Sequence, residues 1–187
     1  MIELAPIVLS RYDRTVNRVY ALIERIGNLL RALERRAAVE AGLQPVHVAM
    51  LGYLAEANRY SDHPVAVAEF LGLTKGTVSQ SLIRLEQLGY LEKVRDERDA
   101  RKTHLRLTRK ARRLLERVQP PALFLKAFGE MPARERDQLV AGLEELLRHM
   151  QRLHGLRTFG VCRTCRFFRQ EDRLARCGLT GEALSVV

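Results

Sequence analysis

The chain has 187 residues, a formal net charge of +10 and a pI of about 10.1. Its hydrophobic share of 47% is ordinary for a soluble globular protein with one core. It shows neither an uncharged run near the roughly 20 residues of a membrane span nor an opening secretory signal. We therefore expect a cytoplasmic protein that does not enter the membrane. Because Lys and Arg are in excess, its expected partner is nucleic acid.

Apolar residues recur every three or four positions from Val19 to Leu33. This period predicts a long helix from about Ser10 to Val39, which Gly42 ends. A helix of this length carries more apolar surface than a small core needs. We expect its surplus face to contact another subunit.

Three shorter helices are predicted next. Pro45 opens the first, "VAVAEFLG" forms the second and ends at Gly72, and the third begins at Thr74. The apolar side chains of the third helix, "TKGTVSQSLIRLEQLGY", share one face. The outward face carries polar side chains that are good hydrogen-bonding groups: Lys75, Thr77, Ser79, Gln80 and Arg84.

The hydrophobic period changes after Gly89. Residues 90–91 and 105–107 are predicted to form the arms of a β-hairpin around the charged loop "RDERDARK". A helix over "RKARRLLERV" should follow and break at Pro120 and Pro121. Pro132 opens a last long helix, whose apolar stripe runs from Leu139 to Leu153.

Two short helices joined by a tight turn and followed by a charged hairpin indicate a winged helix-turn-helix. The major groove of B-DNA admits one helix, so we expect "TKGTVSQSLIRL" to enter it, with Gln80 on adenine and Arg84 on guanine or phosphate. Lys75, Thr77 and Ser79 suit phosphates near the helix N-terminus. The hairpin should carry its basic residues to an adjacent minor groove: Arg95, Arg98, Arg101 and Lys102. Asp96 and Asp99 should brace these arginines and fix the loop.

Residues 10–153 resemble the MarR family of bacterial transcription regulators. "VSQSLIRLEQLGYLEK" is similar to the family's recognition helix and its exit into the wing, and "RDERDARKTHLRLT" is similar to its wing signature. The resemblance implies a mainly α fold with a small β-wing, in an intertwined helical homodimer that binds a palindromic operator. It also implies a repressor rather than an enzyme, and no catalytic motif occurs in residues 1–161.

Many members of the family release DNA when a small phenolic compound or an oxidant acts. A small-molecule inducer is therefore a further expected partner. His47, Tyr53 and His63 lie in a plausible region for it, although such residues more often fill the core or the surface. The alternative function is a metal- or redox-sensing protein whose helix-turn-helix contacts proteins rather than DNA.

The resemblance divides the chain into four parts. These are an N-terminal dimerisation helix (1–44), the winged DNA-binding domain (45–108), C-terminal dimerisation helices (109–153) and a cysteine-containing tail (154–187). The family core does not require the last part, so the tail is an added element.

The tail holds all three cysteines of the chain. Cys162 and Cys165 have the C-x2-C spacing that lets one tight turn bind one metal ion, and Cys177 can return as a third ligand. Zinc is the expected cofactor and an iron–sulfur cluster is the alternative. A metal-free thiol switch and three unrelated thiols are further possibilities. A fourth ligand could be His154, Asp172, Glu182 or a residue beyond the C-terminus.

Overall fold

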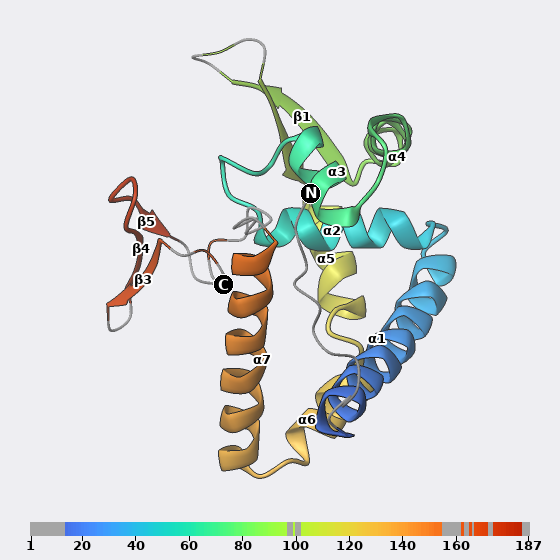
Figure 1. Ribbon diagram of the computed structural model, residues 1–187. Coiled ribbons are helices and arrows are strands. Elements are labelled where there is room, and N and C mark those ends of the chain that lie inside the picture. Colours follow the sequence, from blue (N-terminus) through green and yellow to red (C-terminus); the bar gives the residue numbers. More distant parts are fainter. Residues whose placement is uncertain are drawn as a thin grey trace.

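The computed structural model describes residues 14–96, 99, 102–154, 162, 165, 167–171 and 174–184 (Figure 1). In these residues the fold is mainly α with a small β-wing, as the resemblance implied. The helices and strands of the first two thirds are α1 (Arg14–Glu40), α2 (Pro45–Glu56), α3 (Pro64–Leu71), α4 (Lys75–Gln87), β1 (Leu91–Arg95), β2 (Thr103–Leu107) and α5 (Arg109–Val118). The remaining elements are α6 (Ala122–Gly129), α7 (Ala133–Leu153), β3 (Phe168–Glu171), β4 (Leu174–Cys177) and β5 (Ala183–Leu184). No described helix is long and apolar enough to cross a membrane.

Several predicted helix boundaries are confirmed, although α4 ends at Gln87 rather than at the predicted Tyr90. Pro45 occupies the first turn of α2, and Gly72 ends α3 in the left-handed conformation with φ of 63°. The Thr74 hydroxyl accepts a hydrogen bond from the Thr77 N–H and so caps α4. Gly42 follows α1 with φ of 69°, a conformation that glycine adopts without a steric penalty. Ser10, the expected start of the first helix, lies outside the described residues.

The wing is longer than predicted. Strands β1 and β2 pair antiparallel from Leu91 opposite Leu107 to Arg95 opposite Thr103. The sequence pattern did not predict residues 92–95 as a strand because most of them are charged. In β1 only Leu91 is fully buried. A two-stranded ribbon with one face in solvent tolerates this composition.

The hydrophobic core lies between α2, α3, α4, α5 and the wing. Met50, Leu51, Leu82, Leu85 and Leu91 are almost completely removed from solvent. The core also takes in Ala38 and Leu43 from before residue 45, and Ala111, Leu114 and Leu115 from after residue 108. We call this unit, with its helices α2–α5 and the wing, the winged core.

The terminal helices leave this core. In Figure 1, α1 and α7 both extend away from the wing on the same side of the winged core, and α6, which links α5 to α7, lies near the far end of α1. Sequence analysis missed α6, because we took Pro120 and Pro121 as a break before one last helix. The segment is only 8 residues long and its composition is largely apolar, so it shows no two-sided pattern.

The tail forms a sheet that was also not predicted. Its three strands have the order β3-β4-β5, all antiparallel, and the sheet lies beside the loop between α2 and α3 (Figure 1). The residues between Cys165 and Cys177, expected to form a short loop, therefore include a strand pair. Phe167 and Phe168 are half-buried in it.

Candidate nucleic-acid interface and cysteine segment

Helix α4 is held in place by its inner face. Val78, Ser81, Leu82 and Leu85 are buried against the winged core. All five side chains expected to contact DNA from this helix are exposed: Lys75, Thr77, Ser79, Gln80 and Arg84. The structure thus gives α4 a buried apolar side and an outward polar side that a groove of DNA could accept. The Thr77 hydroxyl is already within 2.9 Å of the Thr74 hydroxyl, so it helps to close the first turn.

The wing carries the second set of predicted residues. Arg95 and Lys102 are exposed on either side of the hairpin loop, whereas Arg98 and Arg101 lie outside the described residues. The expectation that Asp96 and Asp99 fix the loop is confirmed. The Asp99 N–H donates to Asp96 Oδ1 at 2.8 Å, the Lys102 N–H donates to the Asp99 carbonyl at 2.8 Å, and the Asp96 N–H donates to the Lys102 carbonyl at 3.1 Å.

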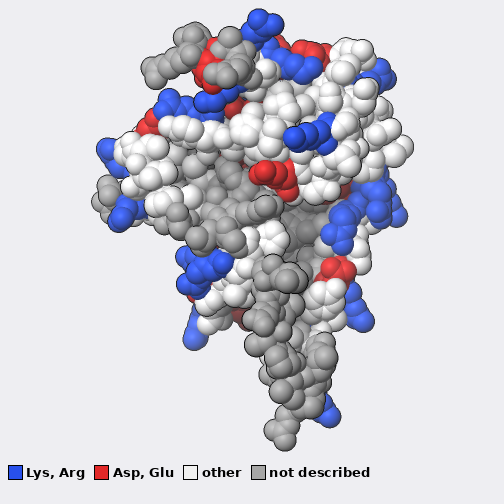
Figure 2. Space-filling view, turned by 45° about the horizontal axis from the view of Figure 1, so that its top comes forward, with Lys and Arg blue, Asp and Glu red and all other residues white. Residues whose placement is uncertain are grey.

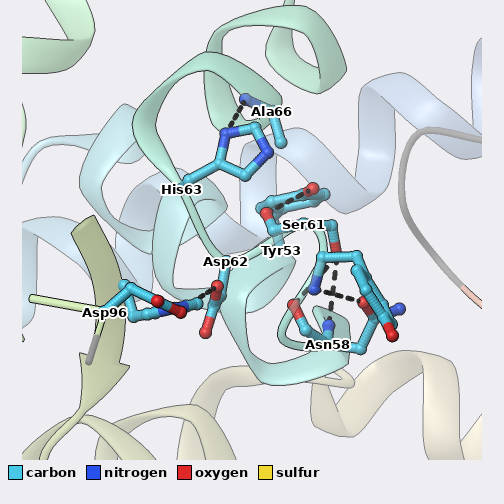
Figure 3. A network of polar contacts seen from close by, with 9 residues as sticks. Tyr53, Asn58, Ser61, Asp62, His63, Ala66 and Asp96 are labelled. Atoms are coloured by element: carbon cyan, nitrogen blue, oxygen red, sulfur yellow. Dashed lines mark hydrogen bonds and ion pairs between the residues drawn. The ribbon is translucent and has the colours of Figure 1, made fainter. Parts of the chain in front are cut away.

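Sequence reasoning missed His104. This side chain lies between two carboxylates, with Nδ1 2.6 Å from Asp62 Oδ1 and Nε2 2.9 Å from Asp96 Oδ2 (Figure 3). Hydrogen bonds that the Asp96 and Asp62 carboxylates accept from the imidazole raise the pKa of His104 above its ordinary value. The Leu105 N–H also donates to the Asp62 carbonyl at 2.7 Å. The α2–α3 loop therefore holds the base of the wing. Asp62 and His104 are 42 positions apart, so a local sequence pattern could not predict this contact.

Three polar contacts fix α4 relative to the wing and α5. Glu86 Oε2 accepts from Lys93 Nζ at 2.6 Å and joins α4 to β1. Lys110 Nζ donates to the Leu88 carbonyl at 2.8 Å and lies over the Tyr90 ring, 4.3 Å from its centroid. Thr108 Oγ1 donates to the Gly89 carbonyl at 2.8 Å. These contacts determine how α4 and the wing are presented together to a partner.

Positive charge is spread widely over the molecule. Figure 2 shows Lys and Arg over the top and sides of this face, with fewer Asp and Glu among them. The arrangement agrees with the net charge of +10. It would attract a polyanion from several directions.

His47, Tyr53 and His63 have structural roles. His47 Nδ1 accepts the Gln44 N–H at 3.2 Å, and His63 Nδ1 accepts the Ala66 N–H at 3.2 Å, so the two histidines complete the first turns of α2 and α3. The Tyr53 hydroxyl donates to the Ser61 carbonyl at 3.0 Å. Burial, and then the Arg84 charge, lower the pKa of His47, while burial raises the pKa of Tyr53. The ordinary interpretation of these residues as fillers is the one that the contacts support.

The backbone brings the cysteines of the tail near one another. The Cys165 N–H donates to the Cys162 carbonyl at 2.9 Å, and the Phe168 N–H donates to the Cys165 carbonyl at 2.9 Å, so Cys162 and Cys165 share a tight turn. Phe168 then pairs with Cys177 across β3 and β4. In the described residues, however, no group of three or more His, Cys, Asp or Glu side chains converges as a metal site.

Cys162 and Cys177 have different surroundings. Cys162 Sγ accepts from Asn58 Nδ2 at 2.8 Å. Burial is the main cause that raises the pKa of Cys162, and the neighbouring Cys165 and Cys177 add to it. Hydrogen bonds from the Thr180 side chain and from backbone groups of Thr180 and Leu179 lower the pKa of Cys177. Of these two thiols, Cys177 is the one whose surroundings favour the thiolate form that binds metals.

The predicted fourth ligands are placed unequally. The Glu182 carboxylate contacts the Arg59 guanidinium and lies 3.3 Å from the Tyr60 hydroxyl, so it serves to dock the tail. His154 ends α7, where its N–H donates to the Met150 carbonyl at 2.9 Å. Asp172 lies outside the described residues. A pocket of about 280 Å³ lies between the tail and the α2–α3 loop, and Cys162, Asn58 and Glu182 are among its lining residues.

Known proteins share the part of the chain that carries this interface. Residues 41–102 match the model of the MarR family. An HTH-type transcriptional regulator of Bacillus subtilis, YkoM, is 28% identical over 146 residues, which are 70% of this chain and 92% of that protein. The matched family region includes α2, α3, α4 and β1 and ends just before β2.

Solved structures share the fold as well. FabT of Streptococcus pneumoniae, in complex with DNA, is 29% identical with a TM-score of 0.57, and the match covers 74% of this chain and 99% of FabT. A MarR transcriptional regulator from Methanosarcina mazei has a TM-score of 0.58 at 19% identity, covering 75% of this chain and 99% of that one. The winged core is thus similar, in sequence over residues 41–102 and in fold, to regulators of the MarR family.

Proposed function

We propose that the protein is a cytoplasmic repressor that binds a palindromic DNA operator as a homodimer. The observation that carries this proposal is the outward polar face of α4, which the buried face and the wing contacts hold rigidly on a strongly basic chain. The complex of FabT with DNA supports it, since that protein shares 29% of its residues with this chain.

The exposed side chains divide into two groups by chemistry. Gln80 can make a bidentate contact with adenine, and Arg84 can do so with guanine or bind a phosphate. The hydroxyls of Thr77 and Ser79 and the ammonium of Lys75, all near the N-terminus of α4, suit phosphates. Arg95 and Lys102 would bring positive charge to the adjacent minor groove, together with Arg98 and Arg101.

The homodimer is supported by the apolar faces of the terminal helices. Helix α1 exposes eight large apolar side chains: Val16, Val19, Tyr20, Leu22, Ile23, Ile26, Leu29 and Val39. Helix α7 exposes seven: Leu139, Val140, Leu143, Leu146, Leu147, Met150 and Leu153. Apolar stripes of this extent are rarely left in water. A second copy of the chain is the natural cover, because both helices leave the winged core on the same side.

A pocket between the terminal helices strengthens the same argument. It has a volume of about 240 Å³, and side chains of α1, α6 and α7 line it, among them Leu29, Phe124 and Leu139. An apolar side chain of a second subunit could fill it. Two winged cores joined in this way could place their α4 helices in successive major grooves, about 34 Å apart.

Operator selection followed by a salt titration tests the proposal. The full chain would be used to select duplexes from a random library, and binding would then be measured at different salt concentrations. A dimer that makes about 6–10 phosphate contacts should lose on the order of 10³–10⁵ in affinity between 50 and 200 mM salt. Absence of duplex binding at low salt would favour the alternative, in which the helix-turn-helix contacts a protein.

We also infer that DNA binding responds to a thiolate metal centre in the tail, held by Cys162, Cys165 and Cys177. The supporting observation is that Cys162 and Cys165 share one turn, and that Phe168, which follows this turn, pairs with Cys177 in the adjacent strand. Zinc suits this donor set, and the metal would have to draw the three sulfur atoms together. An iron–sulfur cluster is the alternative, and a small-molecule inducer remains a further possible signal.

Metal analysis and a visible spectrum of protein purified without air test the centre. One zinc per subunit would leave the protein colourless, whereas an iron–sulfur cluster would colour it brown. The matched control is the variant with all three cysteines replaced by serine, which should lose the metal. Equal metal content in the two proteins would refute the centre.

A further inference from the structure

Described residues of the tail contact the start of the loop between α2 and α3, and we call residues 58–62 of this loop the junction loop. Cys162 Sγ accepts from the Asn58 side chain at 2.8 Å. Glu182 contacts the Arg59 guanidinium and lies 3.3 Å from the Tyr60 hydroxyl. Three consecutive residues of the loop therefore contact the tail, and Asn58 does so through one of the three cysteines of the predicted metal centre.

The next two residues of the junction loop hold the winged core. The Ser61 carbonyl accepts from the Tyr53 hydroxyl of α2 at 3.0 Å. Asp62 holds the wing through its side chain, 2.6 Å from His104 Nδ1, and through its carbonyl, which accepts from the Leu105 N–H at 2.7 Å. Residues 58–60 thus contact the tail, whereas Ser61 and Asp62 contact α2 and the wing; Figure 3 shows Asn58, Ser61 and Asp62 in sequence along this loop.

The loop is built to move as one body. The Asn58 carbonyl accepts from the N–H groups of both Ser61 and Asp62, each at 2.9 Å. The Asn58 N–H donates to Ser61 Oγ at 3.1 Å, and Asn58 Oδ1 accepts from the Tyr60 N–H at 2.8 Å. A shift of the Asn58 side chain would therefore be passed to Asp62 through short hydrogen bonds rather than lost in a flexible segment.

We propose that the junction loop couples the cysteine segment to the wing, with Asn58 and Asp62 as positioning residues. Metal binding at the cysteines would move or rigidify Cys162, the loop would follow, and the wing would change its position relative to α4. The proposal rests on the proposed DNA binding and metal centre, and it names the residues through which one controls the other. Coupled sites of this kind typically change each other's affinity about 5- to 150-fold.

Hydrogen–deuterium exchange of the wing tests the coupling without DNA. The full chain would be compared after chelation and after addition of zinc, and exchange would be followed in peptides that contain β2. We expect zinc to change β2 exchange about fivefold or more in the wild type and to leave it nearly unchanged in Asn58→Ala and Asp62→Asn. Zinc content, measured in parallel, should remain that of the wild type in both variants.

A second variant tests the docking itself. Arg59→Ala removes the ion pair with Glu182 and should change β2 exchange even without zinc. Its matched control is Arg148→Ala, which removes another exposed Arg–Glu pair, 3.2 Å from Glu145 on α7. The control should leave the wing unchanged.

The outcomes separate this coupling from the proposals on which it rests. A wing that exchanges equally with and without bound zinc, and equally in Arg59→Ala and wild type, would overturn the coupling. If no zinc binds but Arg59→Ala and Asn58→Ala alter the wing, the coupling stands and the metal centre fails. If zinc alters the wing but no duplex is bound, the coupling stands and the DNA-binding proposal fails.

Discussion

The winged core and the terminal helices use apolar residues in opposite ways. In the winged core Met50, Leu51 and Leu85 are completely buried within a single chain. In α1 and α7 the apolar residues form equally regular stripes but remain largely exposed; Ile26, for example, is 53% exposed. Helical periodicity in the sequence therefore identifies an apolar face on a helix. It does not tell whether the rest of the same chain covers that face.

The largest expected effect is the loss of the proposed dimer when the exposed stripe of a terminal helix receives a charge. Leu146 lies on the exposed stripe of α7. Leu146→Asp would leave an unpaired charge in the proposed interface, so we expect complete loss of the dimer in sedimentation at micromolar concentration. Arg148→Ala on the same helix is the control. A wild-type protein that sediments as a monomer would contradict the proposed homodimer.

The second largest effect is the loss of stability when a buried side chain of the winged core is shortened. Leu51 is 0% exposed in the winged core. Leu51→Ala should lower the free energy of unfolding by about 2–5 kcal/mol, because the substitution leaves a cavity in a closed core. Urea denaturation at several protein concentrations measures this loss, which should persist at concentrations where the dimer is saturated. The same substitution at exposed Leu174 should cost far less.

A smaller effect separates base reading from general attraction. Gln80→Ala should cost about 1–3 kcal/mol at one operator position, because a bidentate contact with a base is lost. Arg95→Ala should instead weaken selected and random duplexes alike and reduce the salt dependence, and Arg98→Ala should do the same. Equal losses on operator and random DNA for Gln80→Ala would remove this residue from the base-reading set.

The smallest effect concerns the clamp at the base of the wing. Because the pKa of His104 is raised in the folded chain, its protonated form stabilises the fold. This contribution should be fully present below the unfolded pKa of about 6.5 and be lost as pH rises through the folded value. The difference in unfolding free energy between wild type and His104→Gln should therefore shrink from pH 6 to pH 9. A difference that grows with pH would contradict the clamp.

The pH test requires the His104→Gln variant beside the wild type because a second histidine, His47, also has a shifted pKa. Its pKa is lowered by burial, so its contribution has the opposite sign: stability is lost as pH falls through the folded value. The pH profile of the wild type therefore combines both histidines. Subtraction of the His104→Gln profile leaves the contribution of the wing.

Helix boundaries could be predicted from the sequence where they are determined by one residue and its immediate neighbours. Pro45, Gly72 and Thr74 begin or end helices through their own backbone or side-chain chemistry, so these boundaries could be read directly. Helix α6 and the sheet of the tail were missed. Their segments are short and show no clear period, so packing rather than pattern determines them.

The sequence by itself determined the winged core, the outward residues of α4 and the concentration of cysteines in the tail, because periodicity, capping and spacing act over a few residues. Only the tertiary structure decided that Asp62 holds His104, and that Asn58 and Arg59 receive the tail. These pairs lie 42, 104 and 123 residues apart in sequence, so only the folded chain brings them together. The tertiary structure likewise decided which apolar stripes stay exposed, since exposure depends on what the rest of the chain leaves uncovered.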